Sequence, residues 1–492
     1  MAKNRLAIGF ILLAGALFLS GSDAPAGLRE TVAPPYPLKT LSPAGFGVFA
    51  GILDVIPVSG TSSVAFAANK NASSGAESLM SLQISKTGVC SAARTFESGK
   101  GNPRCVAALW IASSTSGPSG AGGYGLVYVL FTQKLSNPTR WTATVQVAKF
   151  NSAGLRTGSW RQIWTTTTPN GTYVAGPSLF AHNRGDLIGV VFGLSILDIA
   201  HFNVKKGIAY FVEASLPNGY PTGNPAPINI YGDGSYVGCW VYRPAWNGSF
   251  WLVPVATEIY KSPGAWADFQ QVEALVFAVS PISPHYSNLT VINYSLDNRH
   301  SFGELWLAPF PGTEADYWLF VRKTEVIAEA QQRLDQYKYS FSLQRLNWNA
   351  AVVQTKKLAL GNLVHQLTYD PAYVFYDEAD YFTPIIASDE TGTPQLFISR
   401  QHTLDLYKKN TTVPPHRYEH QFILYAVNAK TGASTWKNWS VTLWPNLQAG
   451  GVAKPRIFVF PGGALAVVNS HRYMSSPYGS MSTFSTFPDW VK

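Results

Sequence analysis

The chain has 492 residues, of which 46% are hydrophobic and only 13% are charged. Its 42 Gly, 32 Pro and 13% aromatic residues favour turns and aromatic strands over solvent-exposed helices. The formal net charge is +9, but no run of Lys and Arg is longer than two residues. This spacing gives no support to a nucleic-acid-binding patch, so we expect no nucleic-acid partner.

The first residues, MAKNRLAIGFILLAGALFLSGSDAPAG, have the form of a secretory signal peptide. Lys3 and Arg5 precede an apolar stretch over residues 6–21, and Ala24 and Ala26 offer small residues for cleavage. We therefore expect residues 1–26 to be removed and residues 27–492 to form one secreted domain, with an N-terminal membrane anchor as the alternative. No later segment is apolar over the roughly 18 residues that a membrane helix needs, so no span is expected after removal of the signal.

Two further features agree with an extracellular location. Cys90 and Cys105 are close enough in the sequence to form a disulfide, which leaves Cys239 as a buried apolar residue. Seven Asn-x-Ser/Thr sequons predict a glycoprotein if the host glycosylates: Asn71, Asn170, Asn247, Asn288, Asn293, Asn410 and Asn438.

A short unit recurs along the chain: a proline, an apolar run, a polar or Gly-containing turn and a second apolar run. One copy is AKPRIFVFPGGALAVVNS, over residues 453–470. The seven copies are aligned on Pro43, Pro103, Pro177, Pro225, Pro309, Pro371 and Pro455. We read each unit as a hairpin whose first strand opens with Pro, where a missing N–H is tolerated.

Further strands between the hairpins bring each unit to about four strands. One such sheet cannot bury both faces alone, but sheets packed radially can. The sequence thus predicts an all-β fold, a seven-bladed β-propeller of four-stranded antiparallel blades. The last blade must close the ring with strands from the start of the mature chain, around residues 28–68. One short helix is expected as an insertion over residues 324–337 (TEVIAEAQQRLDQY), which contain good helix formers.

The Pro-apolar step resembles the start of the innermost strand in sialidase-type and arabinanase-type propellers. The stretch LYAVNAKTGASTW resembles a blade of the quinoprotein type. The sialidase motif Ser-x-Asp-x-Gly-x-x-Trp is absent, and NSAGLRTGSW (residues 151–160) is a distant relative of it. The resemblance implies a central channel with ligands bound where the innermost strands begin.

Residues around the repeated prolines are the candidate site. For ligand binding these are Asn102, Arg104, Ser178, Lys454 and Arg456, and for catalysis, if the chain is an enzyme, Asp370 and Tyr373. Arg holds a carboxylate or sulfate through two parallel hydrogen bonds, and nearby cations set the pKa of a carboxyl. The alternative is that these residues cap strands and satisfy loop backbone.

The residues suggest neither a metal nor a cofactor. His416 and His420 have a zinc-like spacing, but PPHRYEHQF enters a strand, where residues four apart lie roughly 13 Å from each other. The Gly-x-Gly-x-x-Gly at residues 120–125 precedes a strand rather than a helix, so it is not a dinucleotide site.

Two functions from different classes fit the sequence. One is a secreted module that binds glycans, including anionic ones, or an extracellular protein at the channel mouth. The other is a glycan-cleaving enzyme, a glycoside hydrolase or polysaccharide lyase acting on an acidic polysaccharide. Hydrolysis usually needs two carboxylates, and Asp370 has no confident partner in the sequence. The ligand and the oligomeric state are not specified by the sequence.

Overall fold

The structure of the chain, a computed structural model, consists of strands, turns and bends wherever it is described, and it has no helix there. The described residues are 29–30, 39–41, 48–70, 74, 76–112, 123–135, 139–200, 204–228, 236–260, 269–279, 286–294, 300–309, 317–328, 336–347, 351–358, 364–365, 373–388, 394–408, 416–428, 434–443, 449–461, 464–473 and 481–487. Nothing in these ranges has the helical length and hydrophobicity needed to cross a membrane. The signal peptide expected over residues 1–26 lies outside them.

The described strands pair into seven sheets, which we call blades I to VII in chain order. Blade I contains β3 (Val48–Pro57), β4 (Ser62–Lys70), β5 (Glu77–Ser85) and β6 (Arg94–Ser98). Blade II contains β7 (Asn102–Ile111), β8 (Tyr124–Leu135), β9 (Arg140–Phe150) and β10 (Arg161–Thr167). Blade III contains β11 (Thr172–Arg184), β12 (Leu187–Asp198), β13 (Val204–Ser215), β14 (Tyr220–Pro221) and β15 (Ala226–Pro227).

The remaining four blades follow the same plan. Blade IV contains β16 (Tyr236–Val241), β17 (Ala245–Trp246), β18 (Trp251–Tyr260), β19 (Phe269–Val279) and β20 (Tyr286–Tyr294). Blade V contains β21 (His300–Pro309), β22 (Tyr317–Ala328), β23 (Gln336–Leu346), β24 (Val352–Leu358) and β25 (Val364–His365). Blade VI contains β26 (Tyr373–Ser388), β27 (Pro394–Lys408), β28 (His416–Asn428) and β29 (Ser434–Leu443), and blade VII contains β30 (Ala449–Val459), β31 (Leu465–Tyr473) and β32 (Met481–Phe487).

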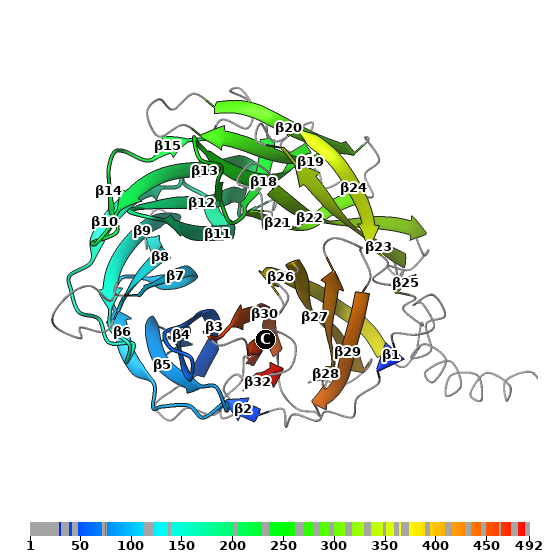
Figure 1. The fold of residues 1–492 in the computed structure, drawn as a ribbon, viewed down its shortest axis with the longest axis horizontal. Helices are drawn as coiled ribbons and strands as arrows, with labels where there is room; N and C mark the ends of the chain where they lie inside the picture. Colours follow the sequence, from blue (N-terminus) through cyan, green and yellow to red (C-terminus); the bar gives the residue numbers. More distant parts are fainter. Residues whose placement is uncertain are drawn as a thin grey trace, which may run out of the picture.

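The blades stand around a common axis, each with its first long strand innermost (Figure 1). Contacts link β3 to β7, β7 to β11, β11 to β16, β21 to β26 and β26 to β30, and β21 also contacts β18 and β19 of blade IV. Contact between β30 and β3 joins the last blade to the first. The all-β propeller of antiparallel blades expected from the sequence is therefore confirmed.

The start of the chain completes the outer edges of the last two blades. β2 (Lys39–Leu41) pairs antiparallel with β32 and becomes the fourth strand of blade VII. β1 (Arg29–Glu30) pairs parallel with β29 at the edge of blade VI. The prediction that early residues close the last blade is confirmed, because β2 joins the three strands that the described residues from 449 onward supply.

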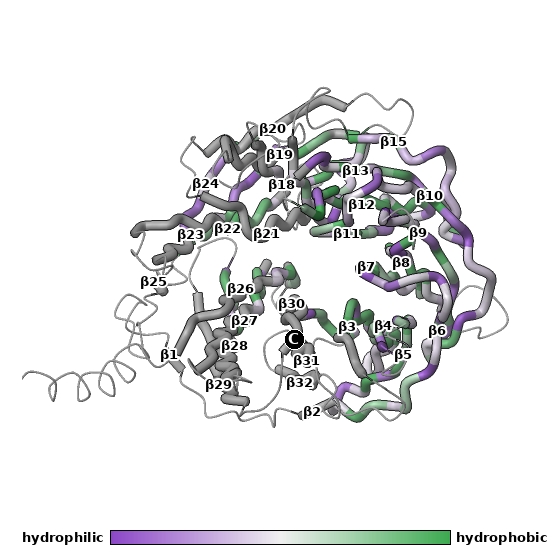
Figure 2. The backbone as a smooth tube through the Cα atoms, turned by 180° about the vertical axis from the view of Figure 1, so that it is seen from behind, coloured by the Kyte–Doolittle hydropathy of each residue, from purple (hydrophilic) through white to green (hydrophobic). Residues whose placement is uncertain are grey.

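The core lies between the blades, so middle strands are buried on both faces. In β8 every residue from Leu126 to Phe131 exposes 2% or less of its surface. Leu126, Tyr128 and Leu130 pack toward blade III, while Val127, Val129 and Phe131 pack toward blade I. Burying each large apolar side chain contributes about 1.5–3 kcal/mol. Figure 2 shows the same pattern, with hydrophobic strands in blades I to III and hydrophilic outer connections.

The prediction of a helix over residues 324–337 is wrong. The first five of these residues belong to β22, and Gln336 and Tyr337 open β23. The two strands pair in register, with Val326 opposite Tyr337. Tertiary packing outweighs the helix propensity of Glu, Ala and Gln here, because Trp318 to Val321 of β22 are buried between neighbouring blades.

The repeated proline marks a β-bulge in the innermost strand. Strand register shifts at Pro103 in β7, at Pro177 in β11 and at Pro455 in β30. Pro has no N–H for the strand ladder, so a position where the ladder is interrupted accepts it. Two other prolines do not fit the repeat: Pro225 precedes β15, an outer strand, and Pro309 ends β21. Pro43 and Pro371 lie outside the described residues.

The residue that follows each bulge bonds the innermost strand of the next blade. Arg456 of blade VII donates through Nε and Nη2 to the carbonyl of Leu53 in blade I, with 2.8 Å from Nε. Asp54 accepts from the Ala108 amide of blade II at 2.8 Å.

The same pattern continues around the ring. The Cys105 thiol donates to the Pro177 carbonyl of blade III at 3.0 Å, and the Ser178 hydroxyl accepts from the Val241 amide of blade IV at 3.0 Å. We call these four contacts the axial relay. The innermost strand has a paired neighbour on one side only, so the relay satisfies backbone groups on its other edge.

The disulfide expected between Cys90 and Cys105 is not formed, and both residues are in the thiol form. Cys90 packs against the apolar cluster between blades I and VII, whereas Cys105 packs between blades II and III and donates to Pro177. The two side chains therefore lie between different pairs of blades. Cys239 is free and fully buried, as expected.

We predict that Ser178→Ala lowers the free energy of unfolding by about 1–3 kcal/mol. The change leaves the Val241 amide without its hydroxyl acceptor, and an unsatisfied buried donor costs about that much. Urea denaturation followed by circular dichroism measures the effect. Ser98→Ala, at an exposed position of β6, is the matched control. A Ser178→Ala stability equal to that of the control would contradict the relay.

Candidate functional site

Two of the residues expected at the channel mouth, Ser178 and Arg456, belong to the axial relay. Each side chain is half-buried and bonds backbone of the adjacent blade. The strand-capping alternative raised by the sequence therefore describes Ser178. Arg456 has an additional role, because its charge also acts on the pKa of Asp54.

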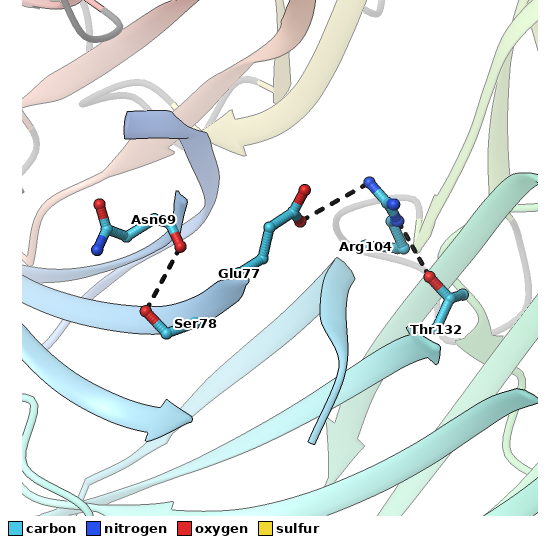
Figure 3. Close-up of polar contacts among 5 residues, drawn as sticks. All are labelled: Asn69, Glu77, Ser78, Arg104 and Thr132. Carbon is cyan, nitrogen blue, oxygen red and sulfur yellow. Dashed lines mark hydrogen bonds and ion pairs between the residues drawn. The ribbon is translucent and has the colours of Figure 1, made fainter. Parts of the chain in front are cut away.

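Arg104 contacts the neighbouring blade rather than the other candidates. It forms an ion pair with Glu77 at 3.8 Å and donates from Nε to Thr132 Oγ1 at 3.1 Å (Figure 3). The Glu77 side chain is only 7% exposed, so a buried carboxylate holds the guanidinium between blades I and II. The structure thus places Arg104 and Arg456 in separate contacts.

The other candidates are placed by backbone only or lie outside the description. Asn102 is the half-buried first residue of β7 and pairs with Thr132 of β8. Lys454 lies in β30 at the bulge, and Tyr373 opens β26. Asp370 lies outside the described residues.

The sequons fall in several environments. Asn170 is exposed in the turn before β11, and Asn247 accepts backbone N–H groups of Ser249 and Phe250 through Oδ1. Asn288 and Asn293 lie in β20 and Asn438 in β29. Asn71 and Asn410 lie outside the described residues.

Asp54 is an ionisable residue on β3, the innermost strand of blade I. A bulge between Ile52 and Asp54 interrupts β3 at this point. Asp54 Oδ2 accepts from the Ala108 amide at 2.8 Å, and Oδ1 accepts from the Val55 amide at 2.9 Å. Burial nevertheless raises the pKa of Asp54 above its usual value, against the opposing effects of Arg456, the two amides and Arg243.

Arg243 reaches Asp54 electrostatically from another blade. It follows β16 of blade IV, and blades II and III separate it from blade I along the ring. Their interaction lowers the pKa of Asp54 and raises that of Arg243, while burial lowers the pKa of Arg243 overall. The interaction therefore joins two blades that are not consecutive along the chain.

His182 completes the group. Its Nδ1 lies 2.9 Å from Nη2 of Arg243, and burial together with that cation lowers the pKa of His182 to about 3. The imidazole is therefore neutral at pH 7. We call Asp54, His182, Arg243 and Arg456 the axial cluster. All four residues are partly exposed to solvent. For Asp54, His182 and Arg243, burial is nevertheless the largest cause of the pKa shift, because protein surrounds these side chains on most sides.

The cluster can bind an anion and exchange a proton. Arg243 and Arg456 both act electrostatically on the carboxylate of Asp54, and the neutral His182 adds no charge, so these four groups together carry net positive charge. A guanidinium binds a carboxylate or sulfate through two parallel hydrogen bonds. A carboxyl with a raised pKa keeps its proton to a higher pH than usual, as a general acid must.

Sequence reasoning missed Asp54, His182 and Arg243 because it looked only beside the prolines. A signal was present in two of them. Asp54 interrupts the apolar run GILDVIP, and Arg243 interrupts CWVYRPAW. A single charge within an apolar run of the sequence needs a partner when it is buried.

The described residues contain no group of three or more His, Cys, Asp or Glu side chains arranged to hold a metal ion. His416 and His420 both lie on β28 and are separated by three residues along that strand.

Asp377 directly follows the bulge of β26 in blade VI. This is the register position that Asp54 holds in β3.

Comparison with known proteins gives similarity at the level of structure only. No protein-family model and no curated protein sequence matches the chain. Among solved structures, the α-L-arabinofuranosidase Arb93A of Fusarium graminearum is 10% identical, with a TM-score of 0.41 over 94% of this chain and 95% of that one. The α-L-arabinanase of Penicillium chrysogenum, solved with arabinobiose, is 8% identical, with a TM-score of 0.40 over 91% and 98%. The haemagglutinin-neuraminidase of parainfluenza virus 5 is 10% identical, with a TM-score of 0.33 over 74% and 87%.

We predict that His182 makes the fold sensitive to acid. Between its usual value near 6.5 and its folded pKa of about 3, only the unfolded chain binds the proton, so stability falls as pH is lowered. The contribution is at most about 1.4 kcal/mol per pH unit. Asp54 acts with the opposite sign, because its raised pKa lets the folded state take up a proton first. Urea denaturation of the wild type and of His182→Gln, from pH 8 to pH 4, measures how much of the pH dependence of the unfolding free energy comes from His182. Parallel curves for the two proteins would contradict the assignment.

Proposed function

We propose that this chain is an exported, glycosylated β-propeller that engages an acidic glycan at the axial cluster. Export rests on the signal-like residues 1–26 and the sequons, and residues 27–492 would form the mature domain. The observation that carries the proposal is that two cations, Arg243 and Arg456, both act on the carboxylate of Asp54.

The ligand group we propose is a sugar carboxylate or a sulfate ester. Both are anions with oxygens spaced for a guanidinium fork. Water is partly excluded from the cluster, so the attraction between charges is stronger there than at an open surface. Arg243 is the better candidate for direct contact, because Arg456 already donates from two nitrogens to Leu53.

Cleavage of the bound glycan is the second candidate, favoured by the raised pKa of Asp54. A carboxyl that stays protonated above its usual range can act as a general acid. Glycoside hydrolysis also requires a second carboxylate. Asp377 follows the bulge of blade VI as Asp54 follows that of blade I, and we propose it for this role.

The experiment compares the secreted wild type with Arg243→Met. Calorimetry measures binding to an oligogalacturonate, a sulfated oligosaccharide and a neutral oligosaccharide of equal length. We expect Arg243→Met to weaken binding of the acidic sugars by about 10-fold or more, since hydrogen bonds to charged groups are worth about 1.5–3 kcal/mol. Release of reducing ends from the same sugars, measured also for Asp54→Asn and Asp377→Asn, separates cleavage from binding.

Arg184→Met is the matched control. Arg184 is exposed and stacks on Trp246, with its guanidinium carbon 3.8 Å from the ring centroid, and it is not part of the axial cluster. We expect it to bind acidic sugars as the wild type does. Equal wild-type affinity for neutral and acidic sugars, or an unchanged affinity in Arg243→Met, would overturn the proposal.

A further inference from the structure

His182 and Arg243 form a hydrogen bond in which the chemistry of the two groups decides which one donates. Nη2 of Arg243 lies 2.9 Å from Nδ1 of His182. A guanidinium has only N–H donors, so Nδ1 must accept. The imidazole therefore carries its proton on Nε2 and is neutral, because a protonated ring has no acceptor nitrogen.

The imidazole is itself held by aromatic packing. It meets the Trp251 ring edge to face, with centroids 6.3 Å apart. Trp251 is fully buried and donates from Nε1 to Glu213 Oε2 at 3.1 Å. Trp251 also packs against Trp246 at 5.3 Å and lies next to Gly189, where a Cβ would come within 2.7 Å of its ring. The indole has little room to move, so His182 rests on a rigid surface.

Arg243 has a long, flexible side chain that interacts electrostatically with Asp54 of blade I. Holding a long cation in one orientation costs side-chain entropy unless another group restrains it. His182 lies on β11 of blade III and Arg243 follows β16 of blade IV, so the contact crosses a blade junction. An Asp or Glu at position 182 would also restrain Arg243, but it would neutralise the cation.

We infer that His182 is a positioning residue, a neutral acceptor that aims the Arg243 guanidinium at the axis while leaving its charge available to an anion. The ligand part of this inference rests on the proposed function. The contact and tautomer do not, so they can be tested without any ligand.

The first test uses NMR of the full chain labelled with ¹⁵N and ¹³C only in histidine. Of the nine His, one signal disappears in His182→Gln and is thereby assigned. We expect that imidazole to stay neutral with its proton on Nε2 from pH 8 to pH 5. In Arg243→Met its pKa should rise, because the cation contributes to lowering it. A signal that titrates near pH 6.5 in the wild type, or that carries its proton on Nδ1, would overturn the inference.

The second test separates positioning from packing. His182→Gln keeps an acceptor for Arg243, whereas His182→Leu removes it at similar volume. We expect His182→Leu to weaken binding of a sulfated oligosaccharide by about 10-fold, His182→Gln to stay within about threefold of the wild type, and Arg184→Met to bind as the wild type does. Thermal unfolding of each variant identifies any loss that reflects folding rather than orientation.

The outcomes distinguish this inference from the proposed function. If Arg243→Met loses binding while folded His182→Leu binds normally, the positioning role of His182 is wrong. The proposed anion site at Arg243 is then still supported. If the wild type binds none of the acidic sugars, the proposed function fails, and the NMR result alone decides the role of His182. Equal losses in folded His182→Gln and His182→Leu would overturn the acceptor role.

Discussion

The unpaired inner edge of each innermost strand is the constraint on which this structure depends. A strand next to the axis has a ladder partner on one side, and the N–H and C=O groups on its other side need bonds that no further strand supplies. Four consecutive junctions, from blade VII to blade IV, meet this need with one side chain each: Arg456, Asp54, Cys105 and Ser178. Each follows a bulge, which interrupts the ladder and lets the side chain reach the next blade.

The same constraint brings charge to the axis. Leu53 lies at the bulge of β3, and satisfying its carbonyl places the Arg456 guanidinium near Asp54. Satisfying the Ala108 amide places the Asp54 carboxylate at the junction of blades I and II. Arg243 of blade IV then adds a cation, and His182 of blade III adds a neutral acceptor. Groups with a structural role thus form the cluster for which we propose an anionic ligand.

Sequence periodicity was sufficient for the fold but not for the positions of site side chains. Apolar hairpins and turn residues predicted an all-β ring closed by the start of the chain, and β2 closes blade VII in this way. Proline was a reliable marker only where it coincides with a bulge, as at Pro103, Pro177 and Pro455. The residues 324–328 were misread because helix propensity is local, whereas their strand pairing with β23 is not. Asp54 and Arg243 come together from residues 189 positions apart, a proximity that only the closed ring creates.

Hydrogen exchange measured by mass spectrometry tests the axial relay most directly. Peptides covering β7 and β16 are compared in the wild type, Asp54→Ala and Ser178→Ala, since each variant removes the acceptor for one inner-edge amide. The relay predicts faster exchange in β7 but not in β16 for Asp54→Ala, and in β16 but not in β7 for Ser178→Ala. Unchanged exchange in both strands, or the same increase throughout the ring for both variants, would contradict it.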